Sequence, residues 1–188
     1  RPIPDQVYAL LRRTIVTLRL PPGAAIVEKD ITRQLGISRT PVRDAVRLLA
    51  EEGLVAIKPQ SGTFVALINQ AQLEEGRLIR KALEIEGIRL AATRATQESV
   101  DSLYNLIDLQ ERAAGRGDHV AFIDYDDRFH RQISEMSGHL RLWKVINSVK
   151  AQLDRLRLMT IPLPGQNRRV IGQHQAIADA LQKHNAER

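Results

Sequence analysis

The first third of the chain alternates short helical patterns with helix breakers. Apolar residues recur at helical spacing over residues 4–19, and the cluster Pro21-Pro22-Gly23 predicts the end of this first helix. Residues 28–35 form a second short helical pattern that stops at Gly36, a residue suited to a left-handed cap. The apolar side chains of the first helix are Val7, Leu10, Leu11, Ile15 and Leu18.

A third helix and a hairpin are predicted next. Ser38 is placed as the N-cap of this helix, and Pro41 falls in its first turn, where the missing N–H costs little. The apolar face continues up to Gly53 and consists of Val42, Ala45, Val46 and Leu49. Residues 54–57 and 63–67 are rich in β-branched and aromatic side chains and indicate two strands joined by a tight turn.

Only helical patterns follow Asn69-Gln70, which is therefore the predicted domain boundary. Clusters of Gly, Ser and Pro separate the predicted helices, which cover residues 70–94, 98–115, 119–137, 140–160 and 167–183. We expect a mainly α fold with two domains. Residues 1–68 form a helix-turn-helix unit of three helices plus a β-hairpin, and residues 69–188 form an all-α antiparallel helical bundle.

Composition narrows the classes of function. The chain has 188 residues, 43% of them hydrophobic, and no cysteine, which excludes disulfides, a thiol nucleophile and cysteine-ligated zinc. Its apolar runs are shorter than the roughly 18 residues that cross a bilayer, and the chain does not open with an apolar signal segment. We therefore expect a cytoplasmic protein with no membrane partner.

Charge favours a polyanionic partner. Lys and Arg number 28 against 22 Asp and Glu, which gives a net charge of +6 and a pI of about 10.1. Residues 1–68 hold 10 basic and 6 acidic side chains, a net charge of +4 in the smaller of the two domains. A mildly basic surface is common, so charge alone is equally consistent with ordinary solvation.

The third predicted helix has a polar outward face suited to the DNA major groove. The residues left for that face at its N-terminal end are Arg39, Thr40, Arg43 and Arg47. Arginine can pair with guanine O6 and N7, while Thr and backbone N–H groups near a helix start favour phosphate. The hairpin adds Lys58 and a flexible tip at Gln60-Ser61-Gly62 that could reach the DNA backbone or minor groove. An amphipathic helix with solvated arginines is the alternative.

Several separated motifs cover almost the whole first domain in a fixed order. They are Leu20-Pro21-Pro22-Gly23, Ile37-Ser38-Arg39-Thr40-Pro41-Val42-Arg43-Asp44-Ala45 with Leu48, Glu52-Gly53-Leu54-Val55, and Gly62-Thr63-Phe64-Val65. These motifs resemble those of the GntR family of bacterial transcription regulators. The resemblance implies a winged helix-turn-helix that binds a palindromic operator in double-stranded DNA as a homodimer. It also implies base and phosphate contacts from Lys29, Arg39, Thr40, Arg43 and the wing at Gln60 to Gly62.

Two polar side chains interrupt the apolar stripe of the helix predicted over residues 119–137. The stripe has i, i+3 and i+4 spacing, and Asp126 and His130 take positions where apolar residues belong. His174 takes an inward position in the last predicted helix in the same way. A carboxylate and two imidazoles can coordinate a divalent transition metal such as Zn, Ni, Mn or Fe. A buried Asp–His network without metal is the alternative.

Two further motifs lie in the second domain. Residues 80–92 carry Arg, then Leu-Glu three and four residues on, then Leu-Ala-Ala, and Asp126-Asp127-Arg128-Phe129-His130 precedes Ser137-Gly138. These motifs resemble the FCD ligand-binding domain of the FadR subfamily, in its smaller VanR-like branch. Three of its four usual metal ligands correspond to Asp126, His130 and His174. The fourth would be a histidine on a final helix expected beyond residue 188, because His184 is too close to His174 to replace it.

Open metal positions inside a helical bundle can bind a carboxylate, and a buried cation can complete its recognition. Arg80 is the first candidate for that cation because it adjoins an apolar stripe. Arg155 and Arg157 are further candidates, although salt bridges on a helix face would explain both equally well. The FadR-subfamily resemblance implies a regulator, in most cases a repressor, whose operator affinity is controlled by a small organic acid.

Two other functions use the same residues. A metal-dependent hydrolase would need a carboxylate spaced as a general base, and the sequence offers neither this nor a phosphate loop or a Ser-His-Asp order, so we expect no enzyme. A ligand-independent DNA-binding protein would keep Asp126, His130 and His174 as a structural network, although an apolar interior would suit it better. Thermal stabilisation by a ligand would distinguish a ligand-controlled regulator from this ligand-independent alternative.

Overall fold

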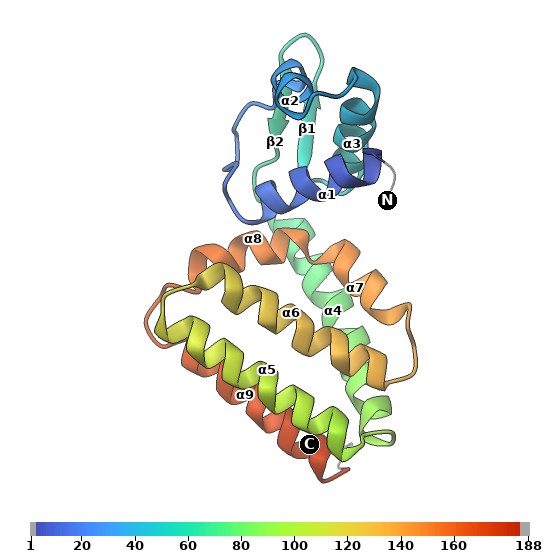
Figure 1. Cartoon of the computed structure of the whole chain (residues 1–188), viewed down its shortest axis with the longest axis vertical. Coiled ribbons are helices and arrows are strands. Elements are labelled where there is room, and N and C mark those ends of the chain that lie inside the picture. Colours follow the sequence, from blue (N-terminus) through green and yellow to red (C-terminus); the bar gives the residue numbers. More distant parts are fainter. Residues whose placement is uncertain (1–2, 185–188) are drawn as a thin grey trace. The chain divides into compact units, whose positions relative to one another are not determined.

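A computed structural model describes residues 3–184 of the chain, which fall into two compact units. The first unit runs up to Leu73 and also includes Ala151–Arg155. The second unit contains Glu74–Lys150 and the residues from Leu156 onward. Figure 1 shows the helices of both units and the hairpin of the first. The predicted mainly helical fold with a β-hairpin in its first part is confirmed.

The first unit consists of a helix-turn-helix and a hairpin around one apolar core. Its elements are helices α1 (Ile3–Val16), α2 (Glu28–Leu35) and α3 (Arg39–Glu51) and strands β1 (Val55–Lys58) and β2 (Gly62–Val65). The core joins one face of α1 to one face of α3, because the spacing of their apolar residues follows the helical period. The residues fully or nearly buried there are Val7, Leu11, Ile15, Val42, Ala45, Val46 and Leu49.

Two local backbone conformations shape this unit. The first helix ends at Val16 rather than at residue 19, because Leu18 adopts the left-handed conformation with φ 58°. Strands β1 and β2 pair antiparallel, with Val55 opposite Val65, and Ala25, which precedes α2, adds an isolated bridge to Phe64 of β2. The hairpin therefore projects from the helices as a wing.

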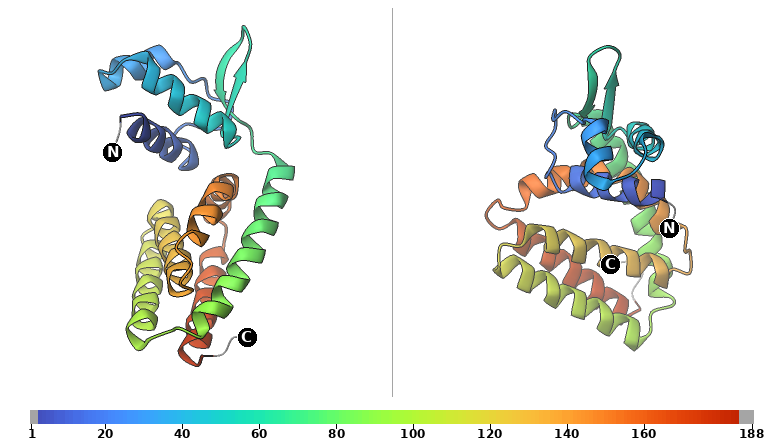
Figure 2. Two further views of the ribbon diagram at one scale, coloured as in Figure 1. Left: turned by 90° about the vertical axis from the view of Figure 1, so that its right-hand side faces the viewer. Right: turned by 45° about the horizontal axis from the view of Figure 1, so that its top comes forward.

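The second unit is a bundle in which α5 packs against both α6 and α9. Its elements are α4 (Gln70–Ala92), α5 (Gln97–Gly115), α6 (His119–Met136), α7 (Leu142–Val149), α8 (Ala151–Thr160) and α9 (Gln166–Gln182), of which the first turn of α4 and the first half of α8 belong to the first unit. Figure 2 gives two further views of this arrangement. Leu103, Ile107, Phe129, Ile133 and Leu181 form the centre of the bundle.

The single helix predicted over residues 140–160 is wrong, because the chain forms two helices that meet at Lys150. Lys150 is only 1% exposed, its ammonium lies 2.8 Å from Asp127 Oδ2, and it also lies over the ring of Trp143. No Gly or Pro marks the break in the sequence. We attribute the break to these tertiary contacts of a buried cation, which local propensity does not encode.

The first half of α8 packs within the first unit. Gln152 Nε2 donates to the carbonyl oxygen of Gly53 at 2.8 Å, and Arg155 Nη2 donates to that of Ala66 at 2.6 Å. Both side chains are buried, so these hydrogen bonds satisfy polar groups that water cannot reach.

None of the helices within residues 3–184 combines the length and the apolar character needed to span a bilayer.

Candidate functional site

The helix-turn-helix presents a basic face at the start of α3. Gly36 closes α2 in the left-handed conformation, and Ser38 stands at the N-cap position of α3 as predicted, but its side chain makes no capping hydrogen bond. The predicted outward residues of α3 are all exposed: Arg39, Thr40, Arg43 and Arg47. Arg47 forms an ion pair with Glu51 at 3.1 Å. Arg39, Thr40 and Arg43 are exposed on the first two turns of the helix.

The wing carries the other predicted contact residues. Lys58 is exposed at the end of β1, with its ammonium 5.6 Å from the centre of the Phe64 ring. Gln60 adopts a left-handed conformation at the tip, and Gly62 has φ 117°, which favours glycine because a side chain would be strained there. Lys29, near the start of α2, is also exposed.

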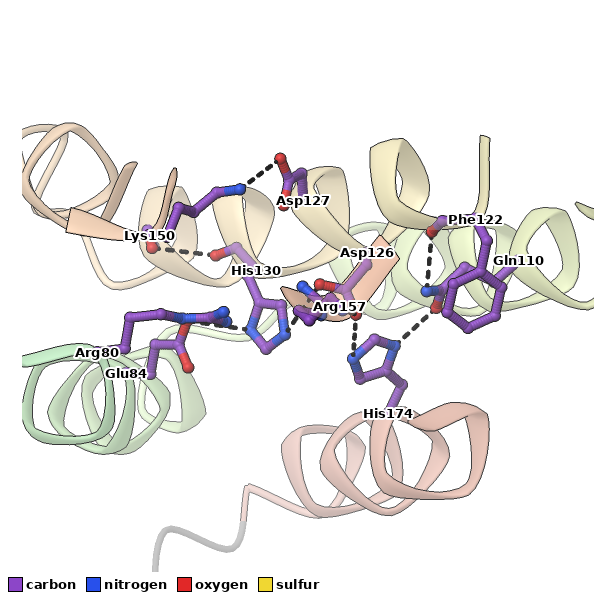
Figure 3. A network of polar contacts seen from close by, with 11 residues as sticks. Arg80, Glu84, Gln110, Phe122, Asp126, Asp127, His130, Lys150, Arg157 and His174 are labelled. Atoms are coloured by element: carbon purple, nitrogen blue, oxygen red, sulfur yellow. Dashed lines mark hydrogen bonds and ion pairs between the residues drawn. The ribbon is translucent and has the colours of Figure 1, made fainter. Parts of the chain in front are cut away.

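The second unit brings Asp126, His130 and His174 together. Asp126 and His130 lie one turn apart on α6, and His174 comes from α9 on the opposite side of the cluster (Figure 3). One candidate ligand atom from each residue lies within 4.8 Å of the others. Nε2 of His174 is 3.4 Å from Asp126 Oδ1, and Nε2 of His130 is 3.7 Å from Asp126 Oδ2. The three side chains that the sequence places inward therefore converge on one point.

Neighbouring groups hold the His174 ring in place. Its Nδ1 lies 2.6 Å from Oε1 of Gln110, and Nε2 of Gln110 donates to the carbonyl oxygen of Phe122. This second hydrogen bond orients the amide so that its oxygen accepts from Nδ1–H of His174, which leaves Nε2 with its lone pair toward Asp126. The ring also stacks on Phe129 with a centroid separation of 4.2 Å.

The other histidine has an acidic neighbour on α4. Nδ1 of His130 lies 3.7 Å from Oε1 of Glu84, and Arg80 donates to the same oxygen at 2.6 Å. Glu84 is thus shared between a cation and a candidate ligand, and Arg80 lies in the neighbourhood of the cluster as predicted (Figure 3).

Two arginines of α8 take separate places. Arg157 Nη2 lies 2.5 Å from Asp126 Oδ1 and forms the shortest ion pair of the cluster in the described chain. Arg155 is not brought to the cluster, because its guanidinium is occupied by Ala66 and Gln152 in the first unit. Residues two apart point to different sides of a helix, so the two arginines could not both face the cluster.

Comparison with known proteins identifies the family. Residues 4–65 match the model for bacterial regulatory proteins of the gntR family, and residues 77–188 match the FCD domain. The chain is 34% identical over 187 residues to the HTH-type transcriptional repressor RspR of Escherichia coli K12, covering 100% of this chain and 82% of that protein. The chain belongs to the GntR family and carries an FCD domain.

Other members of the family agree in sequence and in fold. A probable D-xylose utilization operon transcriptional repressor of Paenarthrobacter nicotinovorans is 32% identical over 188 residues, covering 98% of this chain and 81% of that protein. The solved structure of E. coli McbR/YncC superposes with a TM-score of 0.85 at 25% identity, covering 100% of this chain and 89% of that chain. A GntR regulator from Rhodococcus sp. RHA1 gives a TM-score of 0.78 at 25% identity, covering 98% and 88%. This GntR-family chain is accordingly a DNA-binding transcription regulator and not an enzyme.

Electrostatics in the FCD domain keep the cluster ready for a cation. Burial opposes ionisation of Asp126, but the guanidinium of Arg157 stabilises the carboxylate, and the pKa of Asp126 is held below its ordinary value. Burial lowers the pKa of His174 to about 4 and also lowers the pKa of His130. Both imidazoles are therefore neutral near pH 7 and carry a lone pair that a metal could use.

The donor set fits a divalent transition metal. One carboxylate and two neutral imidazoles are the ligand types that such ions accept, and Gln110 orients one imidazole as outer-shell partners do in metal sites. Arg157 already neutralises part of the Asp126 charge, so a bound cation would have to share this carboxylate or displace the guanidinium.

Sequence reasoning missed two residues that complete the site. Gln110 follows Leu103 and Ile107 on the buried stripe of α5, the same signal of a polar residue at an apolar position that singles out Asp126. Glu84 falls inside the motif that resembles the FCD domain, but its spacing from His130 gave no hint of contact. The sequence offers Arg155 and Arg157 together and does not indicate that only Arg157 reaches the cluster.

Proposed function

We propose that this GntR-family protein is a transcriptional repressor that binds a palindromic operator as a homodimer in the cytoplasm. Two relatives are named as transcriptional repressors, one of them as a probable one, and the exposed basic residues at the start of α3 support contact with DNA. In this proposal Arg39, Thr40, Arg43 and Arg47 enter the major groove. Lys29, Lys58 and the wing tip at Gln60 and Gly62 contact phosphates or the minor groove.

We further propose that a small carboxylate metabolite controls operator affinity from the FCD domain. The observation that carries this proposal is the convergence of buried Asp126 and His174 with partly buried His130 in one oriented cluster. These three residues would hold a Zn, Ni, Mn or Fe ion, which supplies open coordination positions for a carboxylate oxygen.

Arginines near the cluster would complete carboxylate recognition. Arg157 pairs with Asp126 and Arg80 pairs with Glu84. Both guanidinium groups therefore lie close to the cluster, on side chains that are only partly exposed. If a metal ion were held by Asp126, Arg157 would be able to bind the effector's carboxylate, which a guanidinium can contact through two parallel hydrogen bonds. We assign this role to Arg157 in place of Arg155.

One observation favours a second candidate. The 2.5 Å ion pair between Arg157 and Asp126 would also stabilise a cluster with no metal, in which the two histidines only fill the interior. The protein would then bind DNA without an effector at this site. The two candidates differ in metal content and in their response to carboxylates.

The deciding experiment measures metal in the protein as purified, beside Asp126→Ala and His130→Ala. His139→Ala is the matched control, because this histidine is exposed and lies outside the cluster. We expect stoichiometric metal in the wild type and the control and its loss in both cluster variants. A panel of small carboxylates should raise the melting temperature by several degrees, and a chelator should abolish this shift.

Each result has a clear meaning for the FCD domain. Metal-free protein whose melting temperature responds to no carboxylate would leave the Asp126–Arg157 network as a structural element. Metal without a carboxylate response would keep the metal site and overturn the effector class.

A further inference from the structure

A cavity lies between the end of helix α5 and the start of helix α9. Its volume is about 530 Å³, and its lining residues are Glu111, Ala114, Gly165, Asn167, Arg168 and Ile171. The two helices pack side by side within the second unit (Figure 1). Small-molecule sites commonly measure about 300–1,000 Å³. The cavity therefore has room for a small molecule, and none of the three residues of the Asp126, His130 and His174 cluster lines it.

Two opposite charges line this cavity without pairing. Glu111 and Arg168 are both exposed, and neither forms an ion pair in the part of the chain that the structure describes. In the cavity between α6 and α7, by contrast, the lining residues Arg131 and Glu135 pair with each other at 2.9 Å. A molecule that carries one charge of each sign can therefore bridge Glu111 and Arg168, which do not bridge each other.

Other lining groups suit the parts of such a molecule. Gly165 stands at the N-cap of α9 and has no side chain to accept from the first N–H groups, so a carboxylate beside Arg168 can also accept from them. Oδ1 of Asn167 is buried without a hydrogen-bond partner, so turning this amide toward an ammonium would break no hydrogen bond of that oxygen. Ala114 and Ile171 offer apolar contact to a carbon chain.

We propose that this cavity binds a small zwitterionic amino acid. The ammonium of the amino acid pairs with Glu111, its carboxylate pairs with Arg168, and its methylene groups contact Ala114 and Ile171. This site shares no residue with the cluster to which we assign a metal ion and a carboxylate. The inference therefore goes beyond the proposed function and does not rest on it.

The charges of the lining favour a zwitterion over other small ions. A dicarboxylate would set one carboxylate against Glu111, and a diamine would set one ammonium against Arg168, and like charges at close range are costly. Arg112 and Arg169 are exposed neighbours of these residues in sequence, but neither lines the cavity. The lining thus carries one charge of each sign, which a molecule with one ammonium and one carboxylate matches.

The first test measures binding of linear amino acids, from glycine to aminohexanoic acid, to the full chain by calorimetric titration. The series of lengths finds the charge separation that fits Glu111 and Arg168. A chelator is present throughout, so that no carboxylate is bound through a metal ion. At least one member should bind. Butanoate and butylammonium should each bind at least about fivefold more weakly than that member, because each lacks one of the two ion pairs.

The second test changes the two charged residues. Glu111→Gln and Arg168→Gln should each raise the Kd of the best amino acid about fivefold, because each removes one ion pair to the ligand. Glu111→Gln should leave the Kd of butanoate unchanged, since butanoate has no ammonium. Glu98→Gln on α5 and Arg169→Gln on α9 are the matched controls, because both residues are exposed and neither lines the cavity.

The outcomes separate this inference from the proposed function. Absence of binding by every amino acid of the series would overturn the inference. Butanoate that binds as tightly as the best amino acid would also overturn it, because the cavity would then be a site for anions alone. Binding that is kept in Glu111→Gln and Arg168→Gln but lost in Asp126→Ala would place the ligand at the cluster of the proposed function and overturn this site.

Discussion

Gln110 illustrates how one side chain can control a binding site that it does not enter. Its amide oxygen accepts from His174 Nδ1 and fixes which ring nitrogen faces Asp126. We predict that Gln110→Leu lowers metal affinity by about 10–100-fold, the usual effect of removing an outer-shell partner. Competitive titration against a metal indicator dye would measure the change.

A matched control for this prediction lies on the neighbouring helix. Gln132 of α6 donates to Ser99 and bridges α5 and α6 away from the cluster. Gln132→Leu should alter the melting temperature without changing metal affinity. Equal metal affinity in Gln110→Leu and the wild type would show that His174 is oriented by packing on Phe129 instead.

At the residue scale, the sequence identifies side chains by their own periodicity but not by contacts across the fold. Asp126, His130 and His174 could be found because each breaks an apolar stripe on its own helix. The sequence does not show which of Arg155 and Arg157 faces Asp126, because that depends on how α8 packs in the folded chain.

At the scale of elements, α3 and the wing should contribute differently to DNA binding. We predict that Arg43→Ala weakens the free energy of operator binding by about 1–3 kcal/mol. The variant should also relax the sequence preference at one operator position, because arginine can pair directly with guanine. Lys58→Ala should weaken binding to all DNA sequences alike, because it removes a phosphate contact. The slope of the logarithm of the binding constant against the logarithm of the salt concentration should fall in magnitude by about one. Titrations of operator and scrambled DNA at several salt concentrations would distinguish the two effects.

Arg128→Ala is the control for both DNA-binding variants, because Arg128 is exposed on α6 and contacts Tyr125. Its affinity for operator DNA should match that of the wild type. A uniform loss in Arg43→Ala, with unchanged sequence preference, would mean that Arg43 contacts phosphate and that another residue reads the bases.

Element boundaries followed the sequence where a local signal marked them. Gly36 predicts the end of α2 and the turn residues predict the hairpin, because each conformation depends on those residues themselves. Helix α1 ends at Val16, three residues before the end expected from the proline cluster. The break at Lys150 had no such signal. A buried ammonium between Asp127 and Trp143 depends on side chains that only the folded bundle brings together.

At the scale of the whole molecule, α8, like α4, contributes residues to both units. Its first half holds Gln152, which donates to the carbonyl of Gly53 directly after α3, and its second half holds Arg157, which pairs with Asp126. In the proposed function, a carboxylate that changed the partner of Arg157 would act on the second half of this helix.

The proposed control of operator affinity by a carboxylate has a thermodynamic consequence that can be measured from either side. If metal and carboxylate change operator affinity by some factor, operator DNA must change carboxylate affinity by the same factor, typically about 5–150-fold. We predict that Gln152→Met moves this factor toward one while carboxylate affinity without DNA stays unchanged, because only the hold of α8 on the first unit is weakened. Calorimetric titration of carboxylate with and without operator measures both quantities, and Ser148→Ala on α7 serves as the control. If the coupling factor is unchanged in Gln152→Met, the hydrogen bond of Gln152 makes no contribution to it. The linkage between carboxylate binding and operator binding would still hold, but other contacts of the chain would carry it.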